Sequence, residues 1–167
     1  MEIRNYTESD LETCRELWVQ LTERHREIYE DPSIGGDDVG LQFDRHLALV
    51  GADRVWLAEV DGKVVGMVAL MPENDDGDLE MEPLIVSPEA RGAGIGRSLV
   101  QHVFAVARDL GRDVMVRAVG RNDEAIRFYH EMGFDIVGYF EFFHDSRPRS
   151  EQHWRDGETV ADRRFRV

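Results

Sequence analysis

The chain has 167 residues, of which 34 are acidic and 20 are basic, so its formal net charge is −14 at pH 7. A surface of that sign repels nucleic acid and anionic membranes, and we expect neither as a partner. Lys63 is the only lysine, and a GC-rich coding sequence would not explain the acidic excess, so the composition favours a halophilic protein.

Further classes are excluded by what the sequence lacks. No stretch approaches the roughly 18 apolar residues of a spanning helix, and the first residues show no signal-peptide pattern, so we expect a cytoplasmic protein. The length fits a single domain over residues 1–167. Cys14, the one cysteine, lies on an apolar helix stripe and is predicted to be buried and inert. The six histidines show no metal-ligand spacing, so no metal is expected.

The first part of the chain predicts one strand and two helices. Residues 1–6 are typical of a strand, and Ser9 with Glu12 forms a capping box for the long helix that follows. An acidic loop over residues 30–40 separates this helix from a second, short one, which apolar residues at helical spacing predict around residues 43–50.

The middle of the chain predicts three strands. Residues 55–60 and 63–71 are joined by an Asp-Gly dipeptide, which is typical of a type I′ hairpin. Residues 79–86 form the next predicted strand, and its Pro83 removes one ladder donor and fits a bulge or an opened strand.

A glycine-rich loop follows this strand and opens a helix that ends at Gly111. The loop has the pattern R-x-x-G-x-G and reads Arg91-Gly92-Ala93-Gly94-Ile95-Gly96. Its glycines leave backbone N–H groups bare of side chains at the start of the helix, where the positive end of the helix dipole also lies. The sequence therefore predicts a site for phosphate or pyrophosphate.

Two other phosphate-binding loops fit this spacing less well. A nucleoside triphosphate loop requires Gly-Lys-Ser/Thr, whereas this chain has Gly96-Arg97-Ser98. A dinucleotide fingerprint requires a glycine where Arg97 stands and an acidic residue at the end of the next strand, and the chain has neither.

The remainder of the chain predicts one helix among strands. Residues 114–119 are typical of a fifth strand, and Asn122 caps a fourth helix that Gly133 ends. Residues 134–144 and 160–167 are expected to pair as the last strands. The whole predicts an α/β fold, a mixed sheet of about seven strands flanked by four helices.

A second motif accompanies the glycine loop. From Asn122 to Phe134 the chain reads N-x-x-A-x-x-F-Y-x-x-x-G-F. In this order the two motifs resemble the signatures of the GNAT superfamily of acetyl-coenzyme A-dependent N-acetyltransferases, and the resemblance covers roughly residues 55–140. The predicted order of elements agrees with the GNAT fold.

The resemblance implies where acetyl-CoA would bind. The pyrophosphate would lie on the backbone N–H groups of the loop, with added charge from Arg97. The pantetheine arm would bind along the fourth strand at Leu84 and Val86, and the oxyanion donor would be one N–H among Leu84, Ile85 and Val86. The cofactor-binding residues implied by the resemblance are Leu84, Ile85, Val86, Arg91, Gly92, Ala93, Gly94, Ile95, Gly96, Arg97, Asn122 and Phe128.

The resemblance also implies a base and an acid. Glu80 and Glu82 alternate along the strand and so project from the same side, and family members keep a glutamate base at either position. The choice between them stays open, as does their interpretation as solvated acids. Tyr129 matches the phenol that protonates the departing thiolate, with core packing as the alternative. No cysteine is suited to an acetyl-enzyme, so direct transfer in a ternary complex is expected.

The acceptor is expected to be a small cationic primary amine, because the chain is acidic and its loops at residues 30–40 and 145–158 are long enough to cover a groove. The alternatives are the N-terminus or a lysine of a peptide, and a non-catalytic sensor that only binds acetyl-CoA. A homodimer through the last strands is a further alternative, for which Phe140, Phe142 and Phe143 would suit either an interface or a core.

Overall fold

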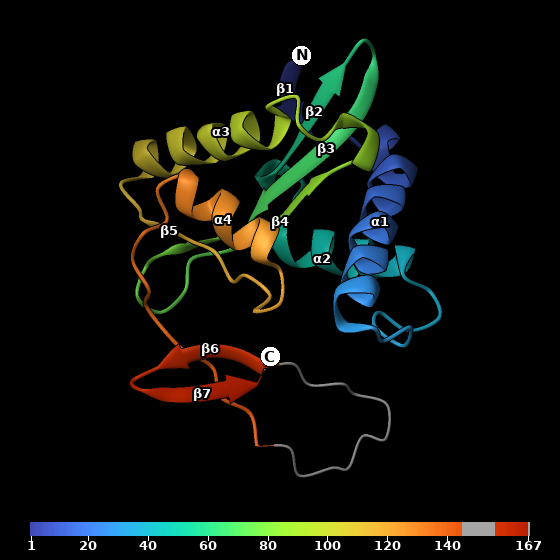
Figure 1. The fold of residues 1–167 in the computed structure, drawn as a ribbon. Coiled ribbons are helices and arrows are strands. Elements are labelled where there is room, and N and C mark those ends of the chain that lie inside the picture. Colours follow the sequence, from blue (N-terminus) through green and yellow to red (C-terminus); the bar gives the residue numbers. More distant parts are fainter. Residues whose placement is uncertain (145–155, 167) are drawn as a thin grey trace. The chain divides into compact units, whose positions relative to one another are not determined.

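Figure 1 shows the computed structural model of the chain, which describes residues 1–144 and 156–166. The chain forms two compact units. The first consists of Met1–Arg24 and Gly35–Arg117, and the second consists of His25–Ile34 and the described residues that follow Arg117.

A five-stranded mixed sheet forms the centre of the first unit, in the strand order β1-β2-β3-β4-β5. Neighbouring strands are antiparallel except for β4 and β5, which are parallel. The strands are β1 (Glu2–Asn5), β2 (Val55–Val60), β3 (Lys63–Leu70), β4 (Leu79–Val86) and β5 (Val114–Met115). The α/β class predicted from the sequence is confirmed.

Helices cover both faces of this sheet (Figure 1). The N-terminal part of α1 (Leu11–Tyr29) and α2 (Gly40–Val50) pack on one face, around the fully buried Phe43 and Leu57. On the other face lies α3 (Ile95–Leu110), which contacts β2, β3 and β4. These helices and the β2–β3 hairpin, which turns through its predicted Asp-Gly dipeptide at positive φ, confirm the sequence analysis.

Cys14 belongs to the core under α1 and α2 and is 0% exposed. Burial raises the pKa of its thiol to about 12, because the low-dielectric surroundings disfavour the thiolate. The prediction of a buried, inert thiol is confirmed.

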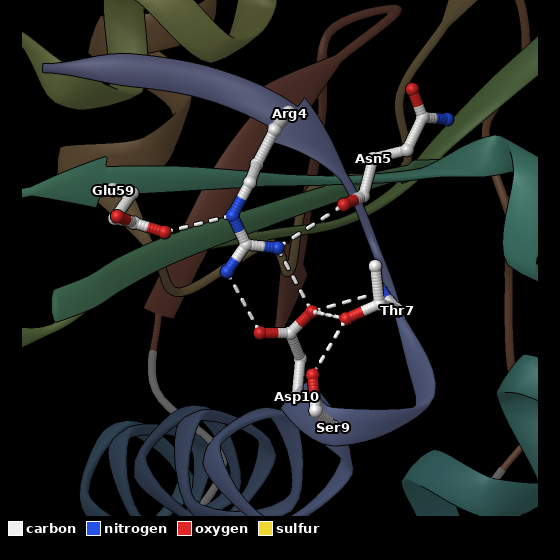
Figure 2. Close-up of polar contacts among 6 residues, drawn as sticks. All are labelled: Arg4, Asn5, Thr7, Ser9, Asp10 and Glu59. Carbon is white, nitrogen blue, oxygen red and sulfur yellow. Dashed lines mark hydrogen bonds and ion pairs between the residues drawn. The ribbon is translucent and has the colours of Figure 1, made fainter. Parts of the chain in front are cut away.

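The capping box of α1 was predicted two residues too late. A 3-10 turn, η1 (Glu8–Asp10), precedes the helix, so the cap is Thr7 and not Ser9. The Thr7 backbone N–H donates to Asp10 Oδ2 at 2.8 Å, and the Thr7 hydroxyl donates to the same oxygen at 2.7 Å (Figure 2). Because of this extra turn, the side chain that accepts a hydrogen bond from the N–H of the cap residue is Asp10 and not Glu12.

The guanidinium of Arg4 joins this cap to the sheet (Figure 2). Its Nη2 donates to Asp10 Oδ1 and its Nε donates to Glu59 Oε2, each at 2.8 Å. The Arg4 hydrogen bonds lower the pKa of Asp10 to about 2, with further help from Thr7. A single side chain on β1 therefore ties β2 to the start of α1.

The second unit contains α4 (Asp123–Glu131) and a hairpin of β6 (Asp156–Val160) and β7 (Arg163–Arg166). The Asn122 side chain accepts a hydrogen bond from the Ala125 N–H at 3.1 Å, so the predicted cap of α4 is confirmed. Four α-helices in all lie within the described residues, and none of these helices is both long and apolar enough to cross a membrane.

Two strand predictions near the C-terminus were wrong. β5 stops at Met115 instead of residue 119, because β4 pairs with it only at Leu79 and Glu80. Residues 134–144 form no strand, and their expected partner β7 pairs with β6. A hairpin closed by two residues loses less loop-closure entropy than the longer connection that was predicted. Residues 145–155 of the predicted loop lie outside the described part of the chain.

Candidate functional site

The parallel pairing of β4 and β5 is short. Leu79 pairs with Val114 and Glu80 pairs with Met115, and no further pair of the two strands is formed in the part of the chain that the structure describes. From Met81 to Val86 the β5 side of β4 therefore has no strand partner among the described residues. An unpaired strand edge offers backbone N–H and C=O groups to an extended ligand.

A bulge interrupts β4 on its other side. Val68 of β3 pairs with Leu84 and Leu70 pairs with Met81, so β4 has one more residue than β3 between these two pairs. The extra residue falls at Glu82 and Pro83, where proline has no N–H for the ladder. The bulge predicted from Pro83 is confirmed.

The two glutamates of β4 differ in their surroundings. Both lie on the more exposed side of the strand, because burial alternates along β4 with Met81 and Pro83 on the buried side. Glu80 forms an ion pair with Arg117, and its side chain is only 14% exposed. The Glu82 residue is exposed, and its carboxylate has no ion pair or hydrogen bond with any described residue. Of the two carboxylates, that of Glu82 is thus the one available to accept a proton or a hydrogen bond from a ligand.

The glycine loop has the conformation that its sequence predicts. Gly92 and Gly94 have φ values of 77° and 81°, in the left-handed region that disfavours side chains, and Gly94 caps the N-terminus of α3. The Ser98 backbone N–H donates to the Gly94 carbonyl at 3.1 Å, which is the first hydrogen bond of the helix. For the N–H groups of residues 92–96 there is no acceptor within residues 1–144 and 156–166. Unpaired donors at a helix N-terminus fit an anionic phosphate.

Short contacts fix this loop at the end of β4. The Ser87 N–H donates to the Val65 carbonyl at 2.8 Å, and Arg91 Nε donates to the Val86 carbonyl at 3.2 Å. Gly66 of β3 leaves room for α3, since a Cβ there would lie 3.2 Å from Cδ1 of Leu99 on that helix. The unpaired strand edge and the unpaired N–H groups therefore follow one another along a single strand-loop-helix segment.

Comparison with known proteins agrees with this arrangement. The family model described as "Acetyltransferase (GNAT) family" matches residues 12–134. The chain belongs to the acetyltransferase (GNAT) family.

Individual GNAT proteins resemble the chain over different lengths. It is 38% identical to N-acetyltransferase family 8 member 2 of Rattus norvegicus over 90 residues, which cover 51% of this chain and 40% of that protein. It is 31% identical to the peptidyl-lysine N-acetyltransferase YiaC of Escherichia coli (strain K12) over 139 residues, which cover 81% of this chain and 84% of that protein. The chain spans about two-fifths of the length of the mammalian relatives it matches.

A solved GNAT structure shows the same fold. The ribosomal-protein-alanine N-acetyltransferase from Brucella melitensis superposes with a TM-score of 0.67 at 25% sequence identity, over 83% of this chain and 86% of that chain. The similarity confirms the fold that was predicted from the two motifs.

The second GNAT motif lies in the second unit. The ring of Tyr129 on α4 contacts those of Phe128 and Phe134, with centroids 5.6 and 5.7 Å away. Burial raises the pKa of the Tyr129 phenol, so the group holds its proton at neutral pH. The Asn122 oxygen is occupied by the cap of α4.

The first unit brings together most of the predicted site. Glu80, Glu82, the strand residues 84–86 and the loop residues 91–97 follow one another along β4, the loop and α3. Asn122, Phe128 and Tyr129 belong to the second unit.

Two residues near β4 were missed from the sequence. Arg117, the partner of Glu80, was included in a strand that the structure ends at Met115. His46 was assigned only to the apolar stripe of α2, yet the residue is only 9% exposed, and this burial lowers the pKa of its imidazole, an effect that the Glu82 backbone opposes. The signal available for His46 was a lone titratable residue on an otherwise apolar helix face.

Proposed function

We propose that the chain transfers an acetyl group from acetyl-CoA to a primary amine, directly and within a ternary complex. Membership of the GNAT family supports this reaction, as do the unpaired N–H groups of the glycine loop. When bound, acetyl-CoA supplies the acetyl group as a reactive thioester. The Glu82 carboxylate on the β4 bulge, which has no ionic or hydrogen-bond partner among the described residues and lies beside a strand edge unpaired in that part of the chain, is the observation that carries the proposal.

Cofactor binding is assigned to backbone groups. Residues 91–97 are proposed to hold the pyrophosphate, with Gly92 and Gly94 supplying the tight turn. The backbone of Leu84 and Val86 is proposed to bind the pantetheine arm as an added strand, because the β5 side of β4 is unpaired there. One N–H of residues 84–86 would stabilise the oxyanion.

Glu82 is proposed as the general base that takes a proton from the amine. Glu80 is the weaker candidate because the Arg117 guanidinium already occupies its carboxylate. With its carboxylate exposed and unpaired among the described residues, Glu82 can accept a proton directly or through one water molecule.

Tyr129 is proposed as the acid that protonates the leaving thiolate. Its place in the second GNAT motif supports this assignment, and its buried phenol, whose pKa burial raises, is protonated at neutral pH and so has a proton to donate. The buried Cys14 supports direct transfer, since its raised pKa makes it a poor nucleophile for an acetyl-enzyme.

The acceptor is proposed to be a cationic amine. The net charge of −14 favours a cation over a neutral or acidic molecule, and a small cationic amine is the first candidate. A lysine side chain of a peptide is the second candidate, favoured by the likeness to a peptidyl-lysine N-acetyltransferase along most of both chains.

An acceptor panel tests the proposal. The protein is mixed with acetyl-CoA and with polyamines, lysine peptides or alanine-terminated peptides, and thiol release is followed. The series is run at about 0.1 M and about 2 M KCl, because the acidic composition predicts a halophilic protein and salt screens charge attraction. We expect turnover with a cationic acceptor. Tight binding of acetyl-CoA without turnover on any amine would instead identify a non-catalytic sensor.

A further inference from the structure

The parallel ladder of β4 and β5 ends at the pair of Glu80 and Met115 in the part of the chain that the structure describes. Side chains alternate between the two faces of a strand, so neighbours on one face of a parallel ladder recur every two residues along both strands. Two residues beyond Glu80 and Met115 are Glu82 and Arg117. A ladder continued in this register would therefore place the Arg117 guanidinium beside the Glu82 carboxylate.

In the structure the Arg117 guanidinium contacts Glu80 instead. Its Nη1 donates to Glu80 Oε2 at the point where the two strands separate. The Glu80 side chain is 14% exposed, whereas the Glu82 residue is exposed. A carboxylate that is shielded from water gains more from a nearby cation than an exposed one does, so Glu80 is the better partner for Arg117.

Arg117 could also reach Glu82. The two glutamates project from the same side of β4, and two residues of a strand span only about 7 Å. Rotation about the side-chain bonds of Arg117 can bridge such a distance. A carboxylate bound to a guanidinium is a weaker base, and the positive charge would also repel a cationic acceptor. A pair of Arg117 and Glu82 would thus oppose the reaction.

Resting on the proposed role of Glu82 as general base, we propose that Glu80 is a positioning residue that holds the Arg117 guanidinium away from Glu82. Glu80 takes no proton and touches neither substrate. It acts by binding the one cation that the strand register would otherwise bring to the base. The two glutamates of β4 then have separate roles, since one binds the arginine and the other stays free for the amine.

The substitution Glu80→Gln tests this role. Glutamine keeps the shape of the side chain but not its charge, so the charge-assisted bond of Arg117 to Glu82 becomes the stronger one. We expect Glu80→Gln to lower kcat by about 3- to 10-fold, as a weakened base would, while the Kd for acetyl-CoA stays unchanged. A kcat equal to that of the wild type would overturn the proposal, as would a rise in Kd in place of the loss in kcat.

Removal of the guanidinium should reverse the loss. When Glu80→Gln is combined with Arg117→Gln, no arginine at position 117 is left to bind Glu82, and kcat should return to within about twofold of the wild type. A general disturbance of β4 predicts the opposite, because two damaging substitutions in contact would not restore activity. A double variant as slow as Glu80→Gln would assign the loss to Glu80 itself and refute the positioning role.

A second ion pair beside the same strands provides the control. Arg112 Nη2 lies 3.2 Å from Glu73 Oε2, and the two side chains are 44% and 40% exposed. This pair joins the segments that precede β4 and β5, at the ends where the two strands begin. Glu73→Gln makes the same change in charge as Glu80→Gln and should leave kcat at the wild-type value. An equal fall in kcat would make the effect one of overall charge and sink the proposal.

Crystal structures locate the guanidinium directly. In the wild type we expect Arg117 on Glu80, and in Glu80→Gln we expect it within hydrogen-bond distance of the Glu82 carboxylate. An Arg117 that keeps its wild-type place in the variant would contradict the proposal even if kcat fell. A wild-type crystal with Arg117 on Glu82 would contradict it without any variant, and so also if Glu80→Gln failed to fold.

Combination with Glu82→Gln separates this inference from the proposed function. If Glu80 acts only through Glu82, Glu80→Gln causes no further loss of kcat in the Glu82→Gln background. An active wild type with fully additive losses refutes the positioning role and leaves the acetyltransferase proposal intact. A wild type without turnover on any amine refutes the acetyltransferase proposal, and the role of Glu80 with it.

Discussion

Arg117 pairs with Glu80 and leaves Glu82, two residues further along β4, without an ionic partner among the described residues. Two glutamates that are equivalent in the sequence pattern are therefore unequal in the fold. Arg117 follows β5 and Glu80 lies on β4, so the ion pair forms where the two strands begin to diverge. The remaining carboxylate is the one on the bulge.

The first prediction concerns these two glutamates. Glu82→Gln should lower kcat by about 10²- to 10⁴-fold, the usual contribution of a general base, with little change in the Kd for acetyl-CoA. Glu80→Gln is the matched control and should have a much smaller effect on kcat. Steady-state kinetics and calorimetry with acetyl-CoA check both variants. A larger loss in Glu80→Gln than in Glu82→Gln would assign the base to Glu80.

The second prediction concerns the two ends of α3. Gly94 and Gly111 both have positive φ, at 81° and 67°, and neither has a neighbour within 4 Å of an added Cβ. Alanine at either position should therefore destabilise the fold by a similar amount, about 1 kcal/mol, through backbone strain. Only Gly94→Ala should weaken binding of coenzyme A, measured by calorimetry. Equal affinities of Gly94→Ala and Gly111→Ala for coenzyme A would show that Gly94 does not take part in the phosphate site.

The third prediction concerns acid stability. Burial lowers the pKa of His25, His46 and His102 from the usual value of 6.5, so at mildly acidic pH the unfolded chain binds more protons than the folded one. The free energy of unfolding should then be fully present above about pH 7 and fall as the pH drops toward about 5. Guanidinium titrations at several pH values measure this slope, and His102→Leu should reduce it. A stability that rises on acidification contradicts the prediction.

The fourth prediction concerns the Arg4 cluster. Asp10 accepts hydrogen bonds from Arg4 and Thr7 and its side chain is 9% exposed, whereas Glu59 accepts from Arg4 alone and is 29% exposed. Asp10→Asn should therefore lower the free energy of unfolding by about 1–3 kcal/mol, and Glu59→Gln by less. The stability due to Asp10 is present above about pH 4 and is lost as the pH falls toward its folded pKa of about 2. Denaturation of both variants at pH 7 measures the difference in their free energies of unfolding. A greater loss of this free energy in Glu59→Gln than in Asp10→Asn would contradict the prediction.

Local signals predicted much of this structure. The glycines at 92 and 94 require left-handed backbone, Gly111 ends a helix, and Asn122 caps one, and each of these depends on residues close in sequence. The bulge at Pro83 was predictable for the same reason, because a missing N–H interrupts any ladder.

Features that depend on distant partners could not be read from the sequence. The length of β5 depends on where β4 turns away from it. The partner of β7 likewise depends on which distant strand lies beside it, and in the structure that strand is β6 and not residues 134–144. The pairing of Arg117 with Glu80 joins positions 37 residues apart. The burial of His46 likewise requires α2 to pack against Trp18 of α1, which no local pattern encodes.

The first residue of β3, directly after the turn of the β2–β3 hairpin, is the exposed Lys63, the only lysine of the chain. Amine-directed reagents can therefore modify a single side chain in addition to the N-terminal amine, and fluorophores or surface tethers can be attached there in a defined orientation. The same residue limits autoacetylation on lysine to one position, so a mass shift after incubation with acetyl-CoA would be assigned by one peptide.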